Sequence, residues 1–269
     1  MNLQYQSKIN RMSVIVAIIL IAFGVSILVP PRVLELDISL FQTLVTFPID
    51  LNFISNLLTA LLAATGMAWF LQLHPGVIGS STIFQHALVP ATTAFILNVA
   101  LRSVSNNVSW WLIFIIGGTI LFLVILAEYS VIDPLDVWQP FASAGLLSLS
   151  YILFLILLSA IAFSEQRLFV IAITVFPVAT LLSYRSLQLK TGSWAFQWSV
   201  GIGYITTFMA VVLHYWPLSA TQYALTLMGL IFALTEYSQN MIEGEKLTHA
   251  VRSPLVILAV FIIISFLIR

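Results

Sequence analysis

The chain has 269 residues, of which 61% are hydrophobic and 7% are charged, and its ten basic side chains balance its ten acidic ones. About a quarter of the residues in a soluble domain are charged, so this composition excludes an ordinary soluble protein. It also excludes a nucleic-acid-binding protein, which needs a basic surface. The mean hydropathy of +1.08 indicates an all-α integral membrane protein.

Nine hydrophobic segments are long enough to cross a bilayer as helices, which takes about 20 residues. We predict these spans at 12–30, 51–72, 82–101, 110–129, 141–163, 168–186, 194–214, 218–237 and 252–268. The seven tryptophans all fall at or near span ends, where an amphipathic ring prefers the headgroup layer. The first span ends in Pro30-Pro31 without a cleavage pattern of small residues, so we expect a retained helix rather than a cleaved signal.

The segment SLFQTLVTFP at 39–48 connects the first two spans. Its apolar residues fall on one helical face and its polar residues on the other, which suits a short helix lying flat at the membrane interface. A plain loop is the other interpretation of this segment.

Four short motifs recur along the chain in the same order. LQLHPG at 71–76 returns as LQLKTG at 187–192, FQ at 84–85 as FQ at 196–197, TTAF at 92–95 as TTFM at 206–209, and AEYS at 127–130 as TEYS at 235–238. Collinear recurrence indicates an internal duplication. We therefore predict one lead helix plus two parallel four-helix repeats, in which residues 1–47 hold the lead helix and the interfacial segment, and residues 48–163 and 165–268 form the repeats. An even number of spans per repeat makes the repeats parallel rather than inverted.

The lysines and arginines of the predicted loops set the expected orientation. Six lie on one side of the nine-span map (Lys8, Arg11, Arg185, Lys190, Lys246, Arg252) and four on the other (Arg32, Arg102, Arg167, Arg269). We expect the plasma (inner) membrane of a prokaryote, with the N-terminus in the cytoplasm and the C-terminus outside.

The two recurring Glu-Tyr pairs, Glu128-Tyr129 and Glu236-Tyr237, are the sharpest candidate sites. A carboxylate at the end of an apolar span suggests a proton or cation site, with the tyrosine hydroxyl as a hydrogen-bond donor. Alternatively, each glutamate extends to the headgroups and each tyrosine anchors the interface. Arg185, at the end of the sixth span, is the expected ion-pair partner if the two glutamates converge.

Gln85 and Gln197 form a second symmetric pair, in the first turns of the third and seventh spans. They line a pathway between the repeats or, alternatively, hydrogen-bond across a helix–helix interface. His86 is a candidate proton relay because Pro90 can kink the same span, although Trp198 occupies the corresponding place in the second repeat.

Enzyme signatures are absent from the sequence. It contains no nucleophile elbow, P-loop or dinucleotide fingerprint, no cysteine, and no HxxxH or HExxH spacing. We therefore expect no catalytic residue, no cofactor and no metal.

Two functions fit these observations. Parallel repeats favour a permease-like carrier or facilitator, and the scarcity of charge within the spans favours a neutral or lipidic small molecule as its substrate. The alternative is a non-catalytic structural or accessory subunit of a membrane complex. The expected partners are the lipid bilayer and either a small-molecule substrate or other membrane subunits, with no nucleic acid; the oligomeric state is not assigned.

Overall fold

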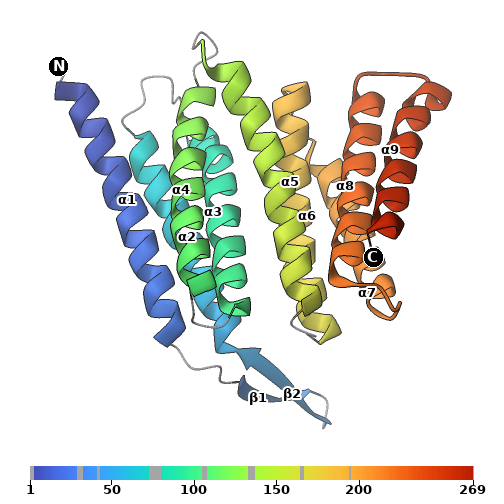
Figure 1. Ribbon diagram of the computed structural model, residues 1–269, viewed down its shortest axis with the longest axis horizontal. Helices are drawn as coiled ribbons and strands as arrows, with labels where there is room; N and C mark the ends of the chain where they lie inside the picture. The colour runs from blue at the N-terminus through green and yellow to red at the C-terminus, as the bar shows by residue number, and fades with distance from the viewer. Residues whose placement is uncertain are drawn as a thin grey trace. The chain divides into compact units, whose positions relative to one another are not determined.

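The computed structural model describes residues 3–28, 33–40, 43–72, 80–104, 108–132, 137–163, 167–193 and 195–268. These residues form nine helices and two strands (Figure 1). In chain order they are α1 (Leu3–Leu28), β1 (Val33–Leu40), β2 (Thr43–Asp50), α2 (Leu51–Leu71), α3 (Ser80–Ser103), α4 (Val108–Val131), α5 (Gln139–Phe163), α6 (Leu168–Thr191), α7 (Phe196–His214), α8 (Ala220–Ile242) and α9 (Leu247–Leu267).

Each predicted span coincides with one described helix, and eight of the described helices are long and apolar enough to cross a membrane. The helix outside this set is α8, whose 23 residues include polar Thr, Gln, Tyr, Glu, Ser and Asn side chains. A ninth crossing therefore stays a prediction, whereas the helical class and eight apolar helices of spanning length are confirmed.

Helix α6 continues beyond its predicted end at residue 186. It runs to Thr191 and closes on Gly192, whose φ of 68° is the left-handed conformation that glycine adopts without steric cost. The Gly192 N–H donates to the Gln188 carbonyl at 2.9 Å. The second LQLK motif is therefore helical, and Lys190 lies in the last turn of α6 rather than in a loop.

The segment after α1 is a β-hairpin, so the expected interfacial helix and the alternative plain loop are both wrong. Strands β1 and β2 pair antiparallel, with Leu34 opposite Ile49, Leu36 opposite Phe47 and Ile38 opposite Val45. Apolar and polar residues alternate along 34–40, which is the period of a strand. The pattern of 39–48 alone favours a helix, whereas the alternation that precedes it favours a strand.

The chain divides into two compact units, unit 1 at Met1–Tyr129 and unit 2 at Ser130–Arg269. In unit 1, α2 and α3 pack along each other, α1 lies against both, and the hairpin adjoins the start of α2 (Figure 1). Two glycines of α4 pack closely against side chains of neighbouring helices. A Cβ on Gly117 would lie 3.1 Å from Leu97 of α3, and one on Gly118 would lie 3.0 Å from Leu20 of α1.

In unit 2, α6 packs along α7 and α8 packs along α9, while α8 also contacts α5, α6 and α7. Two glycines bring paired helices together. Gly203 of α7 faces the hydroxyl and Cα of Thr180 in α6, and Gly229 of α8 faces the side chain of Phe261 in α9. Small residues at such positions let membrane helices approach closely.

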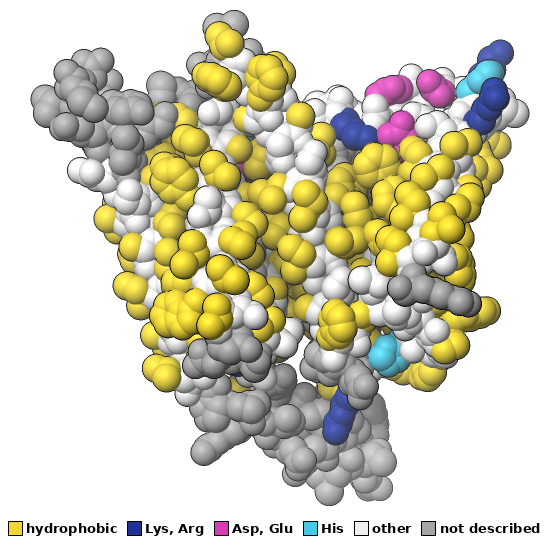
Figure 2. Space-filling model, viewed as in Figure 1, with side chains coloured by type: hydrophobic (Ala, Val, Ile, Leu, Met, Phe, Trp, Pro, Cys, Tyr) yellow, Lys and Arg dark blue, Asp and Glu magenta, His cyan; other side chains and the backbone are white. Residues whose placement is uncertain are grey.

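Hydrophobic side chains cover most of the described surface in the view of Figure 2. Among the described residues, large hydrophobic side chains are exposed on every helix except α8, such as Ile18, Leu58, Phe84, Ile115, Ile152, Ile173, Phe208 and Ile263. An apolar exterior of this kind suits lipid rather than water as the surrounding medium. The predicted repeats at 48–163 and 165–268 divide the chain differently from the two units, and the duplication stays a prediction.

Gly203 and Gly201 provide a matched test of the α6–α7 contact. Gly203→Ala should lower the melting temperature of the purified protein in detergent, at a cost of about 1–3 kcal/mol, because its Cβ would overlap the Thr180 hydroxyl and lie 3.2 Å from the Thr180 Cα. Gly201→Ala, on the same helix with nothing within 4 Å, should be neutral or stabilising. Equal melting temperatures for the two variants would contradict this packing.

Candidate functional site

The first recurring glutamate forms a buried hydrogen-bonded pair with a histidine inside unit 1. Glu128 of α4 lies with its Oε2 2.6 Å from the Nδ1 of His86 in α3. Glu128 is fully buried and His86 is 6% exposed. Helix α3 continues through Pro90, which lacks the N–H that would bond the His86 carbonyl one turn earlier.

One proton lies in the hydrogen bond between the His86 imidazole and the Glu128 carboxyl group. Either the imidazole N–H donates to the carboxylate, or a protonated carboxyl donates to the imidazole nitrogen. A buried carboxylate is costly unless a partner and further hydrogen bonds compensate for lost hydration. The pair therefore compensates Glu128 within the unit, and the carboxylate does not extend to the exposed surface.

The other unit 1 candidates lie beside this pair. Gln85 precedes His86 on α3 and is 9% exposed. The ring of Tyr129 packs against Phe70 of α2, with 5.2 Å between ring centroids. Four predicted residues of the first repeat, Gln85, His86, Glu128 and Tyr129, thus fall where α3 begins and α4 ends.

The second recurring glutamate, Glu236 of α8, pairs with a different kind of residue. Its Oε2 accepts a hydrogen bond from the Lys190 Nζ of α6 at 3.0 Å, and about a quarter of each side chain is exposed. The Lys190 ammonium also lies 5.4 Å from the ring centroid of Phe232, within cation–π range. Tyr237 contacts Trp198 of α7, with ring centroids 6.3 Å apart.

Arg185 and Gln197 have other surroundings. The Arg185 guanidinium is buried, and its Nη1 donates to the Gln188 side chain at 2.8 Å. Gln197 is exposed on α7, in contrast to its predicted counterpart Gln85. Glu128 belongs to unit 1 and Glu236 to unit 2.

Lys190 is a site residue that the sequence reasoning missed, because residues 187–190 were expected to form a loop. In the predicted repeat alignment Lys190 corresponds to His74, which lies outside the described residues. His86 corresponds to Trp198, which contacts Tyr237. Each recurring glutamate therefore has a basic partner, but the two partners come from different motifs. His86 follows the first FQ motif, whereas Lys190 belongs to the second LQLK motif.

A buried polar network in unit 1 was also missed. The Ser26 hydroxyl of α1 donates to Asn98 of α3 at 2.7 Å, and Asn98 donates to Asn56 of α2 at 2.9 Å. Arg102 hydrogen-bonds the Asn52 side chain and the Ser26 carbonyl. Polar residues in the interior of apolar spans were the available signal, because side chains of this kind bond across helices.

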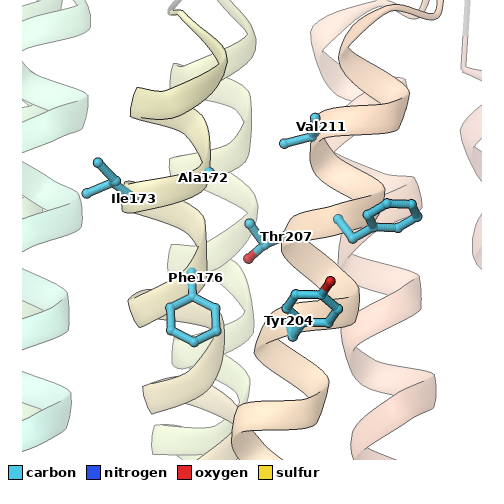
Figure 3. Close-up of a pocket in the computed structure, with 7 residues that line it drawn as sticks. Ala172, Ile173, Phe176, Tyr204, Thr207 and Val211 are labelled. Carbon is cyan, nitrogen blue, oxygen red and sulfur yellow. The ribbon is translucent and has the colours of Figure 1, made fainter. Parts of the chain in front are cut away.

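Unit 2 carries an apolar groove of about 370 Å³ between α6 and α7 (Figure 3). Helix α6 contributes Ala172, Ile173 and Phe176, and helix α7 contributes Tyr204, Thr207, Phe208 and Val211. Figure 3 shows Thr207 and Val211 pointing from α7 into the space that faces α6. No side chain of this lining is charged. Among the described residues, no group of three or more His, Cys, Asp or Glu could hold a metal ion.

The two ion pairs should differ in strength because they differ in burial. In double-mutant cycles, His86→Ala with Glu128→Ala should show a coupling of about 1–3 kcal/mol in detergent unfolding. Lys190→Ala with Glu236→Ala, whose side chains are partly exposed, should show about 0.2–1 kcal/mol. A larger coupling for the exposed pair would contradict the arrangement around Glu128.

Comparison with known proteins identifies a family for this chain. The model of a family described as protein of unknown function (DUF5656) matches residues 29–268. Neither the curated proteins nor the solved structures give a match. The matched range begins after α1 and includes the hairpin, both ion pairs and the groove. The chain therefore belongs to the DUF5656 family.

Proposed function

We propose that the chain is a permease-like carrier or facilitator of a lipidic small molecule. The observation that carries this proposal is the apolar groove between α6 and α7. Both helices are long and apolar enough to cross a membrane, so their outward groove faces lipid when they do. The proposal includes the predicted orientation, with the N-terminus in the cytoplasm.

The lining of the groove supports an occupant with an apolar chain. Pockets for small ligands are mostly apolar, with volumes of about 300–1,000 Å³ and a few polar groups that orient the ligand. The groove is accessible from outside, since Ile173, Tyr204 and Phe208 are more than half exposed. A chain molecule dissolved in the bilayer can enter it sideways.

The polar groups of the groove favour a neutral substrate. The Thr207 hydroxyl donates to the Gly203 carbonyl at 2.7 Å, so it is already engaged within α7. The Tyr204 hydroxyl is then the group that can bond a hydroxyl, ester or amide of the substrate. With no charge in the lining, the proposal is an uncoupled facilitator rather than an ion-driven pump.

The ion pairs have a supporting role in this proposal. His86–Glu128 joins α3 to α4, and Lys190–Glu236 joins α6 to α8. Because each carboxylate has a basic partner, the pairs stabilise helix packing within their units.

The alternative, an accessory subunit of a membrane complex, is favoured by the outward face of α9. This face is apolar and exposed at Leu255, Val256, Val260, Ile263, Phe266 and Leu267. Such a face suits the helices of another membrane subunit as well as it suits lipid.

A substitution that fills the groove tests the carrier proposal. In proteoliposomes that contain phosphatidylcholine with a fluorescent acyl chain, the wild-type protein should speed exchange between leaflets, measured by quenching from outside with dithionite. Ala172→Trp should slow this exchange by about tenfold or more, because the indole occupies the groove that the chain needs.

The matched control is Ala162→Trp, on α5 and outside the groove lining. It should retain wild-type exchange. If Ala172→Trp is as fast as the wild type, the groove is not the pathway. If the wild type is no faster than protein-free liposomes, the carrier proposal is wrong and the accessory-subunit alternative is favoured.

A further inference from the structure

A cluster of hydroxyl groups lies inside unit 2, away from the groove. Tyr151 of α5, Ser186 of α6 and Thr235 of α8 bring their hydroxyls near one another and near the Glu236 carboxylate. All three are buried, with exposures of 5%, 1% and 0%. Along α6, Ser186 lies 13 residues from Ile173 of the groove, which is about 20 Å at a rise of 1.5 Å per residue.

Two members of this cluster have no hydrogen-bond partner among the described residues. Neither the Tyr151 hydroxyl nor the Ser186 Oγ forms a hydrogen bond of acceptable distance and angle. Thr235 differs, because its Oγ1 donates to the Ile231 carbonyl at 2.7 Å. Buried polar atoms of folded proteins are nearly always satisfied, and where protein partners are missing a bound water supplies the bond.

We propose that this cluster is a hydration site in which water bridges the hydroxyls of Tyr151 and Ser186 to Glu236. A buried water needs two to four polar partners. Tyr151 and Ser186 supply donors and acceptors, and Glu236 supplies an acceptor.

Water enters the site beside the Lys190–Glu236 ion pair. About a quarter of both side chains is exposed, so the carboxylate connects the surface of unit 2 to the buried hydroxyls. The water then joins α5, α6 and α8 around the Tyr151 hydroxyl, which lies near the Ser186 and Thr235 hydroxyls but outside the distance and angle of a direct hydrogen bond. This inference does not depend on the groove or on lipid transfer.

Because the chain has no cysteine, a single introduced cysteine reports local water. Only the thiolate attacks a methanethiosulfonate, and apolar burial suppresses thiolate formation. Ser186→Cys in the detergent-solubilised full-length protein should react with 2-aminoethyl methanethiosulfonate at least about tenfold faster than Ser183→Cys. Ser183 is the matched control, since it is buried three residues earlier on α6 and its hydroxyl bonds the Ala179 carbonyl.

Ser193→Cys, at an exposed position after α6, sets the rate for a fully wet thiol. A hydrated site gives Ser186→Cys a rate between the Ser193→Cys and Ser183→Cys rates. A Ser186→Cys rate equal to that of Ser183→Cys would show a dry cluster and overturn the inference.

Tyr151→Phe gives a second readout if Ser186→Cys fails to fold. If the Tyr151 hydroxyl bonds water, Tyr151→Phe should lower the melting temperature. Tyr223→Phe is the comparison: it should also lower the melting temperature, because the Tyr223 hydroxyl donates to the Ala210 carbonyl. If the Tyr151 hydroxyl is buried without any partner, its removal should raise the melting temperature instead. A higher melting temperature for Tyr151→Phe therefore overturns the hydration site.

Discussion

A bilayer core has no water, so every polar group placed there needs a partner from the chain itself or from a bound molecule. Helices satisfy the backbone, and the remaining question is where the polar side chains go. Glu128 pairs with His86, and Asn98 bonds Ser26 and Asn56. These few contacts set the arrangement of helices in unit 1, because apolar side chains alone discriminate weakly between neighbouring helices and lipid.

The two recurring glutamates satisfy this constraint in different ways. Glu128 is fully buried against a histidine, while Glu236 is partly exposed and bound by a lysine. In the predicted repeat alignment, the histidine and the lysine occupy different motif positions. Each of the two carboxylates thus has a nearby basic group, which α3 supplies to Glu128 and α6 supplies to Glu236.

Helix α6 combines two kinds of surface. Its first turns form one wall of the apolar groove with α7, whereas its last turns carry Ser186 and Lys190 toward α5 and α8. Gly203 permits the close approach of α7 that shapes the groove wall. The proposed lipid-binding and hydrated regions therefore share one helix but use opposite ends of it.

The sequence by itself determined the helical class and the places of the long apolar helices, because hydropathy and segment length are local properties that can be read from neighbouring residues. The sequence prediction was wrong at the hairpin. The spacing of apolar residues in 39–48 favours a helix, but the pairing of β2 with β1 makes the segment part of a two-stranded sheet. The sequence also could not assign partners: His86 and Glu128 are 42 residues apart, and Lys190 and Glu236 are 46 apart. Only tertiary packing decided which basic residue meets each carboxylate, because contacts between separate helices leave no periodic signal in either one.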